Sequence, residues 1–365
     1  MKKPPLYIFN WPSNVGGADT KVTHLLLLLH GHYDITMVPN TREQLLQLGW
    51  RKFLKRLNVK AARWDDLPKK LHGVALSLCN GKFLGEGIVL QAKQRGLRVI
   101  WSSEMMWHHG PEIAAVTFGV IDKVLYVSEV QKQLLAPGYG KCPSAITGNY
   151  IAPEMFPFSE RVRAADAPLV IGRLSRPDPA KFPADFPEFY ESLEGETRIA
   201  RRNANGKTIR GNSRNSCQAP RTKFRVMAWS DQMRDVYNHH GFDARWDLLE
   251  KETESQADFL HSLDLFVYSL GPAFRESWGR STVEAMLTGC VPLVPKGGGH
   301  HLENLVPHGK AGFLCSSNDE FREQVQRLRR DVALRKKLSR AARRHAENEL
   351  CNHAEHLRVW KEALS

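Results

Sequence analysis

The residues best suited to chemistry lie in one stretch of the second half of the chain, Phe274 to Met286. Glu276 and Glu284 are separated there by seven residues, with Gly279 between them. Glycine permits a tight turn, and a helix N-terminus presents free backbone N–H groups and the positive end of a dipole. We therefore place Glu276 on a loop and Glu284 in the early turns of a helix. Carboxylates only accept hydrogen bonds, so the pair suits the vicinal hydroxyls of a ribose or a hexose.

Short apolar strand candidates alternate with helical patterns before this stretch, which indicates a parallel sheet covered on both faces. The expected helices of the first series are Asp19–Leu29, Gln44–Leu57 and Leu84–Arg95. Its expected strands are Leu6–Asn10, Ile35–Pro39, Val74–Leu78, Leu97–Trp101 and Lys123–Val127.

A second series of strands follows a proline-containing stretch, Asn149–Phe158, which we interpret as a hinge. These strands are Leu169–Gly172, Phe224–Ala228, Ala244–Trp246, Leu265–Tyr268 and Val291–Val294. Two series predict an α/β fold with two Rossmann-like domains facing each other across a cleft. We assign residues 1–155 to a first domain, 156–345 to a second domain and 346–365 to a C-terminal helix that crosses back to the first.

The stretch around the two glutamates resembles the retaining GT-B glycosyltransferases related to glycogen and sucrose synthases (group 1, family four type). In that family E-x7-E continues with Ala-Met and then with Gly, an apolar residue and Pro. Here Ala285 and Met286 follow Glu284, and Gly289-Cys290-Val291-Pro292 comes next. The resemblance covers roughly residues 5–20 and 120–345.

Three further segments resemble motifs of the family in the same order. Gly16-Gly17 is similar to its glycine loop near the donor phosphates, and Asn149 to Pro153 is similar to its Asn-x-Ile/Val-Asp-Pro junction, with Ala152 in place of Asp. Arg173 and Lys181 resemble the Gly-Arg…Lys pair that neutralises the donor pyrophosphate. Phe182 replaces the glycine that follows this lysine in the family.

The resemblance implies a mechanism as well as a fold. Glu284 would hold the ribose of a UDP- or GDP-hexose, and Glu276 would hold the transferred sugar. Arg173 and Lys181 would stabilise the leaving diphosphate without a metal, so no cofactor is expected beyond the nucleotide-sugar. Retention would follow from same-face attack through an oxocarbenium-like state. Backbone N–H groups would share the binding of the sugar, and they belong to Ser277, Trp278 and Gly279.

Members of this family often place a histidine near the anomeric carbon, after the fourth strand. Here His108 and His109 follow Leu97–Trp101 at that place. We favour His109, because the turn at Gly110-Pro111 would expose it, while the other histidine has a structural role.

The distribution of charge bears on the acceptor, since the resemblance implies that the acceptor binds on the N-terminal domain. The net charge is +13, and residues 1–150 hold 19 Lys and Arg against 10 Asp and Glu. Residues 197–225 form an insertion with nine basic and no acidic residues. A polyanionic partner follows from this distribution. We expect nucleic acid first, with a hydroxymethylated base in DNA as acceptor, as in phage-type DNA modification.

The alternative acceptor is a lipid-linked or cell-surface glycan at an anionic membrane. It depends on Leu45–Arg63, where Trp50, Phe53 and Leu57 alternate with basic residues. That apolar stripe equally fits a helix face that packs on the core. A protein that keeps the fold but only binds is disfavoured, because both glutamates and the Gly-Arg pair are intact.

Composition is consistent with a cytoplasmic enzyme. The six cysteines are scattered with no CxxC pair, which indicates reduced thiols. The longest apolar run, Leu25–Leu29, is far shorter than a membrane span. We predict no signal peptide, and protein partners are not indicated.

Overall fold

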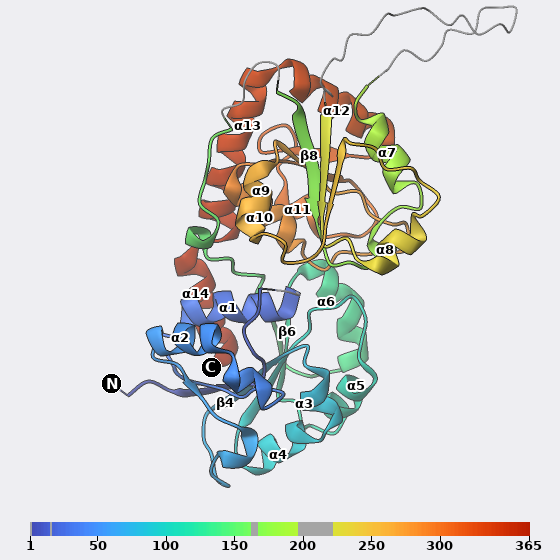
Figure 1. The fold of residues 1–365 in the computed structure, drawn as a ribbon. Helices are drawn as coiled ribbons and strands as arrows, with labels where there is room; N and C mark the ends of the chain where they lie inside the picture. Colours follow the sequence, from blue (N-terminus) through green and yellow to red (C-terminus); the bar gives the residue numbers. More distant parts are fainter. Residues whose placement is uncertain (1, 15–16, 162–166, 196–221) are drawn as a thin grey trace, which may run out of the picture.

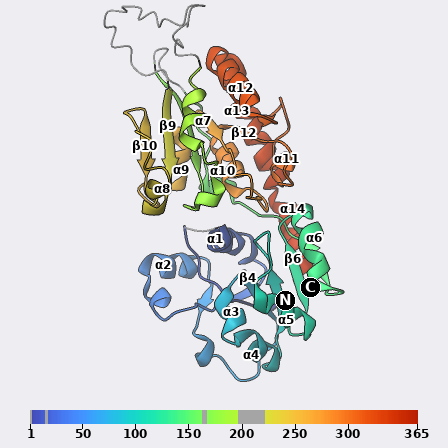
Figure 2. The same cartoon turned by 90° about the vertical axis from the view of Figure 1, so that its right-hand side faces the viewer.

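The structure, a computed structural model, describes residues 2–14, 17–161, 167–195 and 222–365. They form two sheets, stacked one above the other, each with helices on both faces (Figures 1 and 2). Every strand pair in both sheets is parallel. The predicted α/β class with two facing Rossmann-like domains is confirmed.

The first sheet has the order β3-β2-β1-β4-β5-β6-β7. Its strands are β1 (Pro5–Ile8), β2 (Asp34–Met37), β3 (Lys60–Ala61), β4 (Val74–Leu78), β5 (Arg98–Ser102), β6 (Lys123–Tyr126) and β7 (Ser144–Ile146). Its helices are α1 (Gly17–Leu29), the 3-10 turn η1 (Glu43–Leu46), α2 (Leu48–Arg56), α3 (Gly81–Gly85), α4 (Ile88–Gln94), α5 (Gly110–Thr117) and α6 (Glu129–Leu135).

The second sheet has the order β10-β9-β8-β11-β12-β13. Its strands are β8 (Leu169–Leu174), β9 (Thr222–Met227), β10 (Trp246–Leu249), β11 (Leu265–Val267), β12 (Val291–Pro295) and β13 (Phe313–Cys315). Its helices are α7 (Phe186–Ser192), α8 (Asp231–Val236), α9 (Gln256–Ser262), α10 (Arg280–Thr288), α11 (Leu302–Leu305), α12 (Asn318–Arg330) and α13 (Val332–His345).

Two predicted helices are each interrupted. The helix predicted over Gln44–Leu57 breaks at Gln47, whose backbone is extended and whose side chain accepts a hydrogen bond from the Trp11 indole. The helix predicted over Leu84–Arg95 breaks at Gly87, which has a φ of 72°. A left-handed residue ends one helix and starts another, and glycine adopts that conformation without steric cost.

The last helix, α14 (His353–Leu364), leaves the second domain and packs beside α1 (Figure 1). Trp360, Ala363 and Leu364 are buried in the same apolar cluster as Leu25 and Leu29. The two domains are thus linked a second time, through the C-terminal end of the chain.

The first link between the domains, after β7, is anchored on both sides. Tyr150 and Ala152 pack in the core of the first domain, while the intervening Ile151 packs in the core of the second. The backbone N–H of Ala152 donates to Nδ1 of His24 on α1 at 3.0 Å. These contacts fix how the carboxyl ends of the two sheets face each other.

Candidate functional site

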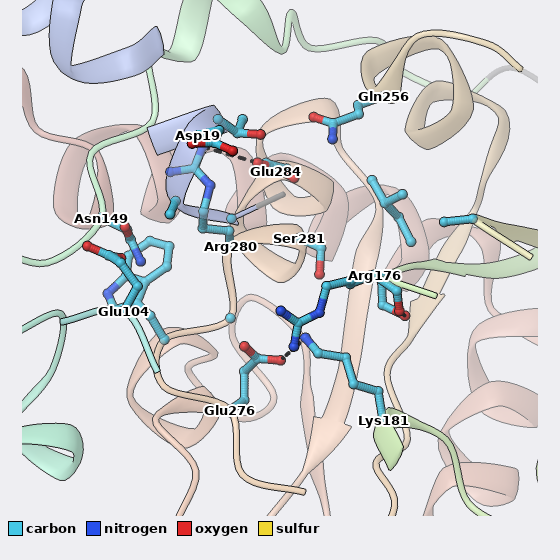
Figure 3. Close-up of a pocket in the computed structure, with 18 of the residues that line it drawn as sticks. Asp19, Glu104, Asn149, Arg176, Lys181, Gln256, Glu276, Arg280, Ser281 and Glu284 are labelled. Atoms are coloured by element: carbon cyan, nitrogen blue, oxygen red, sulfur yellow. Dashed lines mark hydrogen bonds and ion pairs between the residues drawn. The ribbon is translucent and has the colours of Figure 1, made fainter. Parts of the chain in front are cut away.

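A cavity of about 890 Å³ lies between the domains, where the loops that follow the strands of both sheets meet. Ligands of open α/β sheets bind at this edge, outside the carboxyl ends of the strands. The second domain contributes Glu276, Glu284 and Lys181 to its wall. The first domain contributes Gly17 and His109. The structure therefore brings residues predicted from distant parts of the chain into one site (Figure 3).

Glu284 lies in the second turn of α10 and is buried, with 3% of its surface exposed. Burial raises the pKa of this carboxyl, and the Arg280 guanidinium, 3.3 Å away, offsets part of that effect. Arg280 is also held by the carbonyl of Tyr150 in the link between the domains, at 3.3 Å. A buried carboxylate with one cationic neighbour has unfilled acceptor capacity for a polar ligand.

Gly279 immediately precedes α10 and has a φ of 99°. A Cβ at this position would lie 2.4 Å from Cδ2 of Leu302, so both the backbone conformation and the available space require glycine. The turn separates Glu276 on the loop from Glu284 on the helix, as the spacing indicated. Next to it, Trp278 is buried and also lines the cavity.

Glu276 lies at the centre of a polar cluster. Its Oε2 atom accepts from the Lys181 ammonium at 3.0 Å and from the Tyr268 hydroxyl at 2.7 Å. Burial opposes ionisation, but the ammonium and the hydroxyl together outweigh it and lower the pKa of Glu276. Burial likewise opposes the charge on Lys181, yet Glu276 and Tyr268 raise its pKa. Glu276 and Lys181 are therefore a charged pair at neutral pH.

Ser277 ties this loop to the first domain. Its hydroxyl donates to the Glu104 carbonyl at 3.0 Å, and its own carbonyl accepts from the Ser128 hydroxyl at 2.7 Å. The backbone around the turn is thereby held against the opposite wall of the cavity.

Arg173 is not where the resemblance implies. It is fully buried, its guanidinium lies 3.8 Å from the Phe182 ring centroid and 4.7 Å from that of Tyr268, and it does not line the cavity. Nη1 donates to the Ser269 carbonyl at 2.6 Å. Phe182, which replaces the family's glycine, covers the guanidinium. Arg173 therefore lies behind the residues that line the cavity and supports them.

Arg176 occupies the cavity instead. It is partly exposed, lines the cavity and extends toward the Glu276–Lys181 pair (Figure 3). Its positive charge opposes protonation of Lys181, which lies near it (Figure 3). Asp178 pairs with it at 3.3 Å. Two cations close to one carboxylate suit a diphosphate, and the sequence motif pointed only to Arg173 and Lys181.

The glycine loop is described only from Gly17, since Gly16 lies outside the described residues. Gly17 begins α1, and this N-terminus opens on the cavity together with Asp19 of the first turn. A Cβ at Gly17 would meet nothing within 4 Å, because the space beside it belongs to the cavity.

The two histidines have different surroundings. His109 lines the cavity, and its Nε2 lies 3.1 Å from Sγ of Cys79. His108 points away: its Nε2 contacts the Leu135 carbonyl at 2.9 Å, and its ring packs edge-to-face on Tyr139. Of the pair, His109 is the one within reach of a ligand in the cavity.

Sequence reasoning missed a carboxylate in the first domain. Glu104 lines the cavity; its Oε1 accepts from the buried Lys21 ammonium at 2.8 Å and from the Ser102 hydroxyl at 2.7 Å. Among the described residues nothing donates a hydrogen bond to its other oxygen. Burial lowers the pKa of Lys21, and Glu104 offsets part of that effect. The lysine lies on α1, 83 positions earlier, so no local pattern could have shown the pair.

Asn149 also lines the cavity and is 4% exposed. Within the described part of the chain its Oδ1 atom has no hydrogen-bond partner. An unsatisfied buried amide oxygen costs free energy, which a ligand hydroxyl would recover. The junction motif pointed to this residue, although not to a role for it.

Backbone strain gathers around the same cavity. Cys79, Ala228 and Glu252 line it, and their φ angles are 49°, 71° and 62°. Positive φ at residues other than glycine costs free energy, and it is found preferentially at functional sites.

The basic insertion predicted over 197–225 lies mostly outside the described residues. Its last four positions are described, and they belong to strand β9, not to a loop. Arg225 there forms ion pairs with Asp247 and Glu254, both at 2.6 Å. That cation is satisfied within the domain, so the insertion is shorter than predicted.

No protein-family model matches the chain, and neither does any curated protein. Several solved structures are similar to the chain. HepE from Anabaena in complex with UDP and glucose has a TM-score of 0.70 at 13% identity, over 99% of both chains. A glycosyltransferase from Rickettsia africae has 0.67 at 11%, over 99% of both. Sucrose-phosphate synthase from Thermosynechococcus elongatus has 0.65 at 11%, over 99% of this chain and 98% of the other.

These similarities establish the architecture: the chain has the GT-B glycosyltransferase fold. At identities this low, structural similarity shows the fold but not the reaction. The evidence for the reaction lies in the cavity of this chain.

Proposed function

We propose that the protein is a retaining, metal-independent glycosyltransferase that uses a UDP- or GDP-hexose as donor. One observation carries the proposal: the glutamate pair Glu276 and Glu284 from one motif and Lys181 from another line one cavity at the carboxyl ends of the strands. HepE was solved in complex with UDP and glucose and with UDP-glucose, which favours a uridine nucleotide as the donor here.

The donor lies along the wall formed by the second domain. Glu284 accepts hydrogen bonds from the ribose hydroxyls, and Glu276 accepts them from the hexose. Lys181 and Arg176 neutralise the diphosphate as it leaves, in the roles expected of Arg173 and Lys181. Backbone N–H groups of the turn that ends at Gly279 contact the sugar.

The acceptor approaches from the first domain. His109 lies on that side, near the anomeric carbon, and the α1 N-terminus at Gly17 faces the phosphates. The acceptor hydroxyl attacks on the face that the diphosphate leaves, through an oxocarbenium-like state, so that configuration is retained. The departing phosphate oxygen takes the hydroxyl proton, which makes a carboxylate nucleophile unnecessary.

We propose a carbohydrate hydroxyl as the acceptor, ahead of a hydroxymethylated DNA base. The DNA hypothesis depends on the positive charge of residues 1–150 and on the insertion, most of which lies outside the described residues. The first-domain wall of the cavity instead presents two carboxylates, Asp19 and Glu104 (Figure 3). Carboxylates attract sugar hydroxyls and repel a phosphate backbone. Trp107, which is 46% exposed on the same wall, offers an aromatic face for a sugar ring.

Donor turnover in a chelator tests the reaction. The protein incubated with UDP-glucose and other UDP- and GDP-hexoses in EDTA should release nucleotide diphosphate, faster when a suitable oligosaccharide is added. The product should show the donor's anomeric configuration by NMR. Activity abolished by EDTA and restored by a divalent ion would refute metal independence. Faster turnover with hydroxymethylated duplex DNA than with any glycan would reverse the acceptor assignment.

Glu104→Gln should raise the acceptor KM at least tenfold and leave the affinity for UDP within about twofold. The change keeps the volume but removes the charge that binds acceptor hydroxyls, and a hydrogen bond to a charged group contributes about 1.5–3 kcal/mol. Steady-state kinetics and calorimetry with UDP measure the two quantities. Lys21→Met/Glu104→Gln is the folding control, because it also removes the buried ammonium. An unchanged acceptor KM would show that the carboxylate is only structural.

A further inference from the structure

The segment formed by η1 and α2 lies beside the acceptor side of the cavity. The Trp11 indole, in the loop that leads from β1 to the cavity wall, donates to the Gln47 side chain at 2.8 Å. Asn80, which follows Cys79 of the cavity wall, donates to Asn40 at 2.6 Å, directly before this segment. Both hydrogen bonds hold the segment at the carboxyl edge of the first sheet, below α1 in Figure 1.

The inner face of α2 packs on the core. Leu54 and Leu57 are buried in the first-domain cluster, and Trp50 and Phe53 pack against it. Their spacing of i, i+3, i+4 and i+7 is that of one helix face. The aromatic residues on which the membrane alternative depended are therefore partly buried against the core, which favours the core-packing interpretation of the stripe.

The outer face of α2 has a different composition. Leu48, Arg51, Lys52 and Lys55 follow the same spacing on the opposite side, and all are exposed. Leu46 and Leu48 are 67% and 68% exposed. We call these four residues of α2, together with Leu46 of the preceding turn η1, the basic helix face.

The charges of this face are unsatisfied within the described residues. Nearby Lys60 and Arg63 pair with Asp34 and Asp65. No acidic side chain forms an ion pair with any of the three cations of the basic helix face in the described ranges. Three unpaired cations beside two exposed leucines favour a partner that is both anionic and apolar.

We propose that the basic helix face docks on an anionic phospholipid surface. The cations contact lipid phosphates while the two leucines enter the acyl boundary, as in interfacial amphipathic helices. The leucines distinguish this partner from nucleic acid, whose phosphate backbone has no apolar site to receive them. None of the helices in the described ranges could span a bilayer, so the contact is peripheral.

Docking would hold the first domain, which carries the acceptor wall of the cavity, at the membrane surface. An acceptor sugar attached to a lipid would then be concentrated where Glu104 and Trp107 lie. The inference goes beyond the proposed reaction and does not depend on it, because vesicle binding needs neither donor nor acceptor.

Vesicle co-sedimentation of the full chain tests the proposal. The protein should bind phosphatidylcholine vesicles that contain about one third phosphatidylglycerol and should not bind pure phosphatidylcholine. Each surface cation contributes about 1 kcal/mol, or roughly fivefold, so Lys52→Gln/Lys55→Gln should weaken binding about 25-fold. Leu46→Ser/Leu48→Ser should weaken it at least tenfold. The matched control Lys337→Gln/Arg344→Gln removes two exposed charges from α13 and should change it less than twofold.

Two outcomes would overturn the proposal. Equal vesicle binding by Leu46→Ser/Leu48→Ser and the unmodified protein would reduce the contact to a general electrostatic effect. Duplex DNA affinity that falls with the lysine changes, while vesicle binding does not, would assign the face to nucleic acid. Thermal unfolding of each variant separates these outcomes from misfolding, and calorimetry with UDP reports separately on the proposed function, since none of these variants should change donor binding.

Discussion

Glu276→Ala is expected to lower the rate of sugar transfer by about 10²–10³-fold, with little loss of affinity for free UDP. The carboxylate is charged, largely buried and held by Lys181 and Tyr268, so it is preorganised to bind the hydroxyls of the transferred sugar. That sugar is absent from UDP, which explains why nucleotide affinity should persist. Single-turnover transfer and calorimetry with UDP measure the two effects.

The control must account for Lys181. Removing Glu276 leaves this ammonium buried without its partner, and breaking a buried pair commonly costs about 3–5 kcal/mol of stability. The double variant Lys181→Met/Glu276→Gln removes both charges and should unfold closer to the unmodified protein than Glu276→Ala does. Near-normal transfer by folded Glu276→Ala would remove the main support for the proposed role.

Glu284→Ala should affect the other half of the donor, with UDP affinity falling about 10²-fold or more. Two hydrogen bonds to a charged acceptor, at about 1.5–3 kcal/mol each, exceed that factor even at the lower limit. The position on α10 allows such contacts, because the carboxylate borders the cavity and only Arg280 pairs with it among the described residues.

The raised pKa of Glu284 adds a pH dependence. Burial favours the neutral acid, so the fraction of this carboxyl that is protonated increases as the pH falls through the raised pKa. UDP binding by the unmodified protein should weaken in that range. Glu284→Gln should bind UDP weakly at every pH and lose this dependence. The control Glu355→Ala, on the exposed surface of α14, should bind as tightly as the unmodified protein. Unchanged UDP affinity in Glu284→Ala would exclude the ribose role.

Most of the fold was predictable from periodicity. The strand predicted over Val74–Leu78 has those bounds, and the others of both series differ by a few residues at their ends. The strands β3 and β7 were missed, because both lie at sheet edges and are short: both residues of β3 are exposed, and none of the three residues of β7 is fully buried. Edge strands gain little from burial, so their sequences carry a weak apolar signal.

The site was predictable where a local motif determines the geometry. Glu276, Gly279 and Glu284 lie within one turn and the helix that follows, so their spacing along the chain determines their spacing in space. Local spacing did not predict the position of the Arg173 side chain. Its motif is local, but its burial depends on Phe182 and Tyr268, which pack over it.

The sequence by itself determined the two-sheet α/β class, the glutamate pair and the likeness to GT-B glycosyltransferases, since each of these depends on periodicity or on short-range spacing. Tertiary structure alone decided that Arg176 and not Arg173 enters the cavity, that His109 and not His108 faces it, and that Lys21 forms an ion pair with Glu104 in its wall. It also decided which face of α2 meets the core. These features arise where segments far apart in the chain pack together, and burial, which changes charge and accessibility, is a property of that packing.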